Sequence, residues 1–238
     1  MKLPDYAELR CISNFTFLRG ASHAEELVER AQALGYRALA LVDECSLAGV
    51  VRAHVAAKKH GLPLLVGSQF RVQCDTPFTL IVLACNLNGY GNLCEFITFL
   101  RRTSPKGSYR LTLGAIRAEA LADCVVIAVP DRDSEQAPMD TVARWLLQHF
   151  IGRCWLGVTQ LRRLDDEMLL HKLRQSSALT AVPLVAVGDV HMHVRSRKPL
   201  QDVLTATRIG QPLSACGLAL QPNAERHLRS RLILGRCY

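Results

Sequence analysis

A carboxylate and two imidazoles lie close together near the end of this 238-residue sequence, in the run Gly188-Asp189-Val190-His191-Met192-His193. Asp and His side chains together are typical ligands of zinc or manganese. If the run is extended, alternate residues point the same way, so Asp189, His191 and His193 could face one side. A metal would need further ligands from other strands. The alternative is that Asp189 caps a turn and both histidines are surface groups.

Polar side chains at three other places could join this loop. They are Arg10 to Ser13, Asp43 with Glu44, and Gln69. Each follows or lies within a short apolar run that reads as a strand. In α/β barrels the working residues lie at the C-terminal ends of strands, so these positions and the loop are one candidate site.

The elements that must position these residues alternate between short apolar runs and longer helical patterns, which is typical of βα units around a parallel sheet. Strands are expected at Ala7–Cys11, Ala38–Val42, Leu64–Val72, Thr79–Leu83, Cys124–Val129, Cys154–Val158 and Leu184–Val187. Helices are expected at Ala24–Leu34, Ala48–His60, Tyr90–Arg102, Met139–Phe150, Asp166–Leu179 and Pro199–Ile209. The pattern predicts an α/β fold, a TIM-like barrel of seven or eight mostly parallel strands with outer helices, rather than an open doubly wound sheet.

Local signals refine this prediction. Ser22-x-x-Glu25 is a plausible capping box for the first helix, and Gly35 supplies its stop. The polar segments Thr103–Gly107 and Asp131–Pro138 are expected to be exposed loops. We expect one barrel over residues 1–215 and a basic C-terminal segment over residues 216–238.

Composition sets the class of protein. Hydrophobic residues make up 49% and charged residues 21% of the chain, which excludes a disordered protein. The net charge of +8 favours anionic partners such as nucleic acid. Nine cysteines without a Cys-x-x-Cys pair indicate a reducing compartment, and no run is long or apolar enough for a signal peptide or a membrane span. We therefore expect a cytoplasmic protein without a membrane partner.

Three runs resemble the PHP domain of bacterial C-family replicative polymerases, in particular that of the error-prone, translesion branch. They are SNFTFLRGASHAEELVERAQALGYRALALVDECSLAGVVRAH, VGDVHMHVRSRKPLQDVLTATRIG and ALQPNAERHLRSR. The resemblance covers nearly the whole chain. It implies a PHP barrel within a DNA-directed DNA polymerase of DNA repair and replication, whose magnesium-dependent palm domain lies beyond this chain.

The resemblance also implies where a metal site would be, and most of its ligands are missing. The family has a His-x-His after the first strand, where this sequence has Arg10 and Ile12. An acidic residue before a glycine corresponds to Arg19, the second-strand histidine to Glu44 and the third-strand glutamate to Gln69.

Too few ligands of the family pattern are left for a metal. Only Asp189 and His191 match the final Asp-x-His, and Asp43 keeps a carboxylate. A catalytic site needs about three protein ligands per ion, and arginine at a ligand position repels a cation. We therefore expect no cofactor and no catalytic residue in this chain. Arg10 is predicted to form an ion pair with Asp189, with Asp43 as the alternative acceptor.

Three functions follow from these observations. The first is a noncatalytic scaffold that binds the remaining polymerase domains and accessory proteins of translesion synthesis. The second is a residual metal-dependent phosphoesterase or exonuclease built on Asp43, Glu44, Asp189, His191 and His193. The third is a DNA-binding module using the basic residues of the last quarter, with domain contact as the competing role. These residues are Arg195, Arg197, Lys198, Arg226, Arg229 and Arg231.

Overall fold

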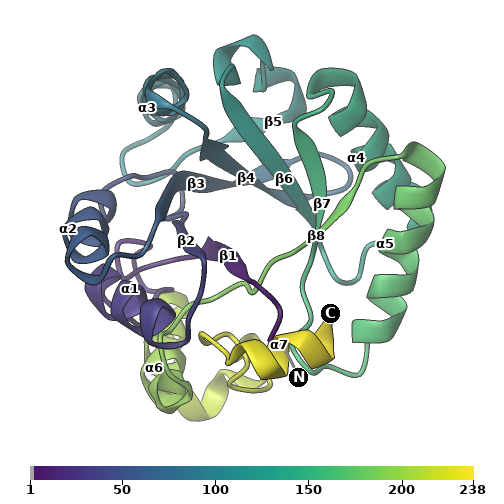
Figure 1. Ribbon diagram of the computed structural model, residues 1–238. Helices are drawn as coiled ribbons and strands as arrows, with labels where there is room; N and C mark the ends of the chain where they lie inside the picture. Colours follow the sequence, from purple (N-terminus) through teal and green to yellow (C-terminus); the bar gives the residue numbers. More distant parts are fainter. Residues whose placement is uncertain (1–2) are drawn as a thin grey trace. The chain divides into compact units, whose positions relative to one another are not determined.

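The computed structural model describes residues 3–238, which divide into two compact units. Unit 1 contains the chain up to Leu65 together with Gly188–Tyr238, and unit 2 contains Val66–Val187. Unit 1 has the elements β1 (Ala7–Cys11), α1 (Ala24–Ala33), β2 (Ala38–Leu41), α2 (Val50–His60), α6 (Lys198–Ile209) and α7 (Arg231–Cys237) (Figure 1). Unit 2 has most of β3 (Leu64–Gln73), and β4 (Phe78–Ala84), α3 (Leu87–Arg102), β5 (Leu111–Thr112), β6 (Cys124–Pro130), α4 (Gln136–His149), β7 (Cys154–Val158), α5 (Asp166–Thr180) and β8 (Leu184–Ala186).

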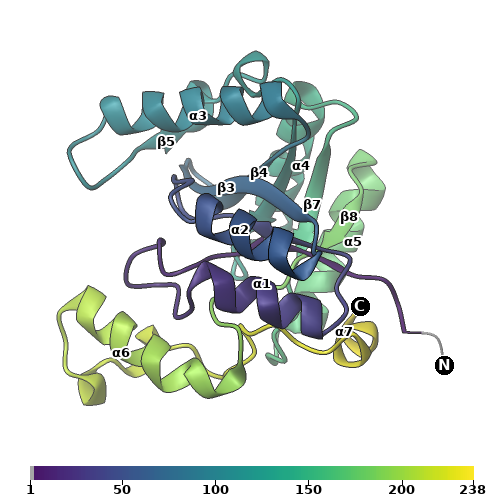
Figure 2. The same cartoon turned by 60° about the vertical axis from the view of Figure 1, so that its left-hand side comes forward.

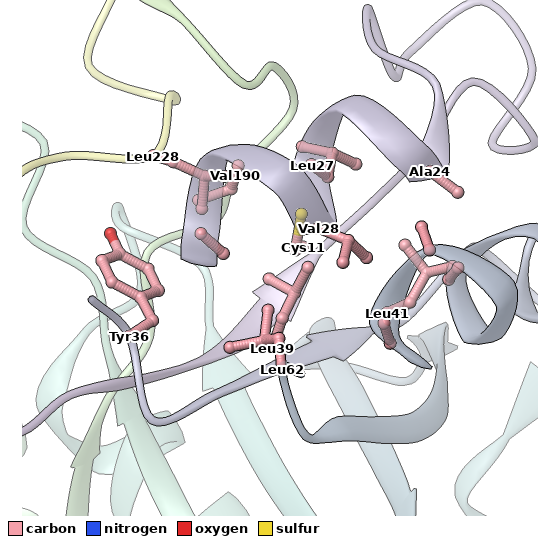
Figure 3. Packing of buried hydrophobic residues seen from close by; sticks show 14 of the residues in the cluster. Cys11, Ala24, Leu27, Val28, Tyr36, Leu39, Leu41, Leu62, Val190 and Leu228 are labelled. Carbon is pink, nitrogen blue, oxygen red and sulfur yellow. The ribbon is translucent and has the colours of Figure 1, made fainter. Parts of the chain in front are cut away.

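The core of unit 1 joins the two ends of the chain. Helices α1 and α2 pack side by side (Figure 2), and β1 pairs in parallel with β2. Leu27 and Val28 of α1 contact a buried cluster that also contains Leu39 of β2. Val190 and Leu228, from the far end of the sequence, complete this cluster (Figure 3). Burial of apolar side chains from both ends therefore stabilises unit 1.

The sheet of unit 2 has the strand order β5-β3-β4-β6-β7-β8. Strand β4 runs antiparallel to β3 and β6, whereas β6, β7 and β8 are parallel. Only a few residues separate β3 from β4, and such a short connection permits only an antiparallel hairpin. The other strands are joined through helices, and α4 and α5 pack beside one another.

The segment that follows β8 pairs with β1 in unit 1. The amide of Ile12 donates to the carbonyl of Val190 over 2.9 Å, and the amide of Val190 donates to the carbonyl of Arg10 over 2.8 Å. The chain after Gly188 is thereby hydrogen-bonded along the end of β1 within unit 1. This pairing places Asp189 beside Arg10.

Every strand and helix expected from the sequence is present, and two local predictions need correction. The cap of α1 is His23, whose amide donates to Glu26 over 2.9 Å, so the capping box lies one residue later than predicted. The hydroxyl of Ser22 instead accepts a hydrogen bond from the amide of His193. Helix α4 begins at Gln136 and takes the last part of the predicted loop Asp131–Pro138.

One strand and one α-helix were not predicted. Strand β5 has only two residues, too few for a period to show. Helix α7 begins after Ser230, whose hydroxyl accepts a hydrogen bond from the amide of Ile233, and lies in the segment expected only to be basic. Among residues 3–238, no helix combines the length and the apolar character needed to cross a membrane.

Candidate functional site

Asp189 is the centre of the candidate site in unit 1. Its carboxylate is buried, and its two oxygens meet different cations. Nε of Arg10 lies 3.3 Å from Oδ1, and Nη1 of Arg226 lies 2.7 Å from Oδ2. The predicted ion pair between Arg10 and Asp189 is therefore present, and a second arginine joins it. Asp189 has a left-handed backbone, with φ of 50°, which costs less for Asp than for most residues.

His191 completes this cluster. Its Nε2 lies 3.2 Å from Oδ1 of Asp189 and 3.1 Å from Nη1 of Arg226. Its Nδ1 lies 3.0 Å from the side-chain nitrogen Nε2 of Gln201, a buried residue of α6. A neutral imidazole with its proton on Nε2 can donate to Asp189 and accept from Gln201. The ring is thus fixed on both sides by protein groups.

The protonation states of the cluster follow from burial and charge. Burial alone would raise the pKa of Asp189, but Arg10 and Arg226 outweigh it and hold that pKa well below its usual range. For His191, burial lowers the pKa to about 4 even though Asp189 acts in the opposite direction. At neutral pH the cluster therefore contains two guanidinium cations, one carboxylate and one neutral imidazole.

A second buried carboxylate, Glu8, holds the backbone around this cluster. One oxygen accepts from the amides of Arg10 and Gly188 over 2.9 and 2.8 Å, and the other accepts from the hydroxyl of Tyr6. Burial raises the pKa of Glu8 despite these donors. A Cβ on Gly188 would come within 2.1 Å of Glu8, so only glycine fits beside this carboxylate.

Asp43 lies after β2 and is held by hydroxyl groups. It accepts hydrogen bonds from the amide and the hydroxyl of Ser13, over 2.8 and 2.7 Å, and from the hydroxyl of Thr16 over 2.7 Å. Burial raises its pKa, although these donors favour the ionised form. The neighbouring Glu44 pairs with Arg19, with 2.9 Å between Oε2 and Nη1.

The remaining predicted positions have other surroundings. Ile12 is buried in unit 1. His193 contacts the start of α1, where its Nδ1 lies 2.8 Å from the hydroxyl of Ser22 and 3.8 Å from Oε2 of Glu26. Gln69 is buried in β3 and belongs to unit 2. The structure therefore brings together Arg10, Asp189 and His191.

The donor set of this cluster does not fit a divalent cation. Guanidinium groups contact both oxygens of Asp189, and His191 directs Nδ1 to Gln201. A metal would have to displace at least one arginine and then remain beside the other positive charge. Among residues 3–238, no three His, Cys, Asp or Glu side chains are arranged to hold a metal ion.

The basic residues of the last quarter are largely engaged within unit 1. Arg195 pairs with Glu225, Arg197 with Glu26 and Lys198 with Asp202. Arg231 lies 3.5 Å from Asp5, Arg226 contacts Asp189, and Arg229 is only 2% exposed. These contacts favour a structural role, because a cation held by a carboxylate attracts phosphate less.

The loop after β6 carries two further carboxylates, Asp131 and Asp133, of which the first is paired. Asp131 forms an ion pair with Arg71, and Arg132 is held by Asp165 and Asp166 of the α5 start. These contacts lie within unit 2. Two-metal chemistry needs carboxylates that are free to share two ions, and Asp131 is instead paired with Arg71.

Two members of the central cluster were missed from the sequence. Arg226 appeared only as part of a basic surface, because it lies 35 residues after His191 in a segment without helical or strand periodicity. Gln201 lies on α6, and nothing in a helical pattern marks which polar residue is turned inward. The pairing of Arg10 with Asp189 was predictable because Arg10 lies at the end of β1 and Asp189 follows β8.

Error-prone DNA polymerases are similar to this chain along its whole length. The enzyme of Dechloromonas aromatica is 51% identical over 242 residues, which cover 100% of this chain and 23% of the polymerase. That of Ralstonia nicotianae is 49% identical over 247 residues, covering 99% and 23%. The chain therefore spans less than a quarter of the length of these relatives.

Solved structures show the fold. An amidohydrolase from Chromobacterium violaceum, with bound sulfate and no metal, matches with a TM-score of 0.59 at 15% identity over 78% of this chain and 87% of its own. A protein from Bifidobacterium adolescentis matches with the same TM-score over 80% of this chain and 89% of its own. The predicted fold class, an α/β barrel of mostly parallel strands with outer helices, is confirmed by this likeness. The PHP domain family matches residues 8–151, and the chain belongs to that family.

Proposed function

We propose that this chain is the N-terminal PHP domain of an error-prone DNA polymerase, and that it acts there as a noncatalytic scaffold in translesion synthesis and DNA repair. Its similarity to error-prone polymerases, at about half identity along the chain, supports the first part. The second part rests on one observation: Arg10 and Arg226 hold the two oxygens of Asp189.

The substituted positions support this proposal together. Arg10 and Arg19 stand where the resemblance places metal ligands, and each neutralises a carboxylate of the same region, Asp189 and Glu44. A buried carboxylate without a metal needs such a cation, because an unpaired buried charge is costly. The ion pairs thus perform the structural task of a metal and leave no open coordination position for a substrate.

The partners and cofactors follow from this role. The remaining polymerase domains would bind this domain, and accessory proteins of translesion synthesis would use its surface. DNA contact through the basic C-terminal quarter is a further proposal, which predicts a steep loss of affinity between about 50 and 200 mM salt. Magnesium would be needed by the polymerase centre elsewhere in the protein, and this chain would need no cofactor. We expect no primer extension by the chain alone.

Elemental analysis tests the proposal. The purified chain is incubated with zinc or manganese, desalted and measured beside its Asp189→Asn variant, together with phosphoesterase activity on a chromogenic phosphodiester. We expect less than about one tenth of an equivalent of metal in both proteins and no activity. Stoichiometric metal in the wild type that is lost in Asp189→Asn would overturn the scaffold proposal and favour a residual phosphoesterase.

A further inference from the structure

The segment Arg226–Ser230, in the C-terminal part of unit 1, contacts the cluster of Arg10, Asp189 and His191, which we call the converted site because arginines pair with Asp189 where the family has metal ligands. The carbonyl of Arg226 accepts hydrogen bonds from the amides of His191 and Met192, over 2.9 and 3.2 Å. The amide of Leu228 donates to the carbonyl of Met192 over 3.3 Å. The segment therefore runs along the loop that carries Asp189 and His191, and it pairs with that loop in parallel at His227.

The same segment delivers a cation into the site. The guanidinium of Arg226 contacts Oδ2 of Asp189 at 2.7 Å and approaches Nε2 of His191 at 3.1 Å. Its side chain is largely buried, as is the carboxylate it meets. The guanidinium thus provides the positive charge beside Asp189 and His191 that a bound metal ion would otherwise provide.

We propose that the converted site is a latch for the C-terminal part of unit 1, in which Arg226 is the built-in cation and Asp189 is its receptor. Engagement of Arg226 orders the segment Arg226–Ser230 and the helix α7 that follows it. Loss of the Asp189 charge releases both. This inference goes beyond the proposed function and does not depend on the chain's being part of a polymerase.

The contacts after Arg226 explain how one ion pair can act on the whole segment. Leu228 is buried in the cluster with Leu27 and Val190 (Figure 3). The carbonyl of Arg229 accepts from the hydroxyl of Tyr36 over 2.7 Å. Ser230 then caps α7. These contacts follow one another along the chain, so a segment that moves away from Asp189 loses the contact of Leu228 first, then that of Arg229 and then the cap at Ser230.

Apolar burial is the competing explanation, since Leu228 could hold the segment without help from the ion pair. A double-mutant cycle separates the two, because only a latch makes the effects of Asp189 and Arg226 depend on each other. The variants are Asp189→Asn, Arg226→Met and their combination. Asp202→Asn is the matched control, since it removes a carboxylate that pairs with Lys198 on α6.

Hydrogen–deuterium exchange of the full 238-residue chain is the measurement. We expect the Leu228 amide and the amides of α7 to exchange about ten-fold faster or more in each single variant. The double variant should exchange no faster than the faster single variant. Asp202→Asn, and the amides of β6 in every variant, should match the wild type.

Two results would overturn the latch. One is unchanged protection of Leu228 in Arg226→Met, a variant that leaves Arg10 on Asp189 and tests the latch even if Asp189→Asn fails to fold. The other is multiplication of the two single effects in the double variant, which would show that the residues act independently. Arg226→Lys should retain part of the protection of the Leu228 amide, because lysine keeps the positive charge but lacks the several N–H donors of the planar guanidinium.

Discussion

Arg19 and Glu44 form an ion pair with 2.9 Å between Nη1 and Oε2, and both stand at positions where the resemblance places a metal ligand. Arg19 comes from the loop before α1, and Glu44 follows β2. Two residues at positions that the resemblance assigns to metal ligands thus form an ion pair with each other. The pair is half open to solvent on the arginine side, whereas Arg10 and Asp189 are nearly enclosed. The two replacements should therefore differ in their effect on stability.

Removing Arg10 should destabilise the fold more than removing Arg19. Arg10→Ala leaves Asp189 with Arg226 and the neutral His191, so we expect a loss of about 2 kcal/mol in the free energy of unfolding. The double variant Arg10→Ala, Arg226→Ala should lose about 3 kcal/mol or more, since both contacting cations are gone. Arg19→Ala should cost less than about 1 kcal/mol. Urea unfolding at neutral pH measures all three, and equal losses for Arg10→Ala and Arg19→Ala would contradict this ranking.

Acid should weaken the wild type relative to Asp189→Asn. The folded pKa of Asp189 is well below that of an unfolded aspartate, so its stabilisation is complete above about pH 5. It is lost as the pH falls from there through the folded pKa. The difference in unfolding free energy between wild type and Asp189→Asn should shrink from pH 5 to pH 3. A difference that stays constant over this range would show that Asp189 is not held as an anion.

His191 should remain neutral in the folded protein until the pH is near 4. Its folded pKa of about 4 lies below that of an unfolded histidine, so the unfolded chain binds the extra proton first. Stability should fall as the pH drops from about 6.5 to 4, by up to about 3 kcal/mol. His191→Gln should lack this part of the pH dependence. NMR titration of the ring gives the direct check, and a ring that titrates near pH 6.5 would refute the assignment.

Gly188→Ala should disturb the site without changing any charge. The added methyl group would come within 2.1 Å of a carboxylate oxygen of Glu8, which three hydrogen bonds hold in place. We expect destabilisation by about 1–3 kcal/mol, the usual cost of overpacking. Gly91→Ala is the matched control, because a Cβ there meets nothing within 4 Å. Similar thermal midpoints for the two variants would show that Glu8 can move aside.

Much of this fold was predictable because strands buried on both faces read as continuous apolar runs. Strands β2, β4 and β6 are of this kind, and their bounds follow the runs closely. The capping box failed because Ser22 and His23 both have side chains able to cap. A tertiary contact decided between them: His193 engages the hydroxyl of Ser22 over 2.8 Å. No local pattern contains that information.

The candidate site was predictable to the extent that it depends on strand ends. Arg10 lies at the end of the first strand and Asp189 directly follows the last, so their pairing could be predicted. Arg226 could not, because it reaches Asp189 from a segment whose sequence has no helical or strand period. Its position depends on the burial of Leu228 and the backbone bonds at Met192, which appear only when both ends of the chain are packed.

The division of unit 1 between the two ends of the chain affects its synthesis. Its helices α1 and α2 emerge from the ribosome early, but Leu228 and Leu234, which cover them, follow roughly 160 residues later, a delay on the order of 10–30 s at ordinary rates of translation. Unit 2 is continuous in sequence and is fully synthesised first. During this interval α1 and α2 lack the apolar cover that Leu228 and Leu234 provide, so unit 1 can complete its native packing only after all of unit 2 has been synthesised.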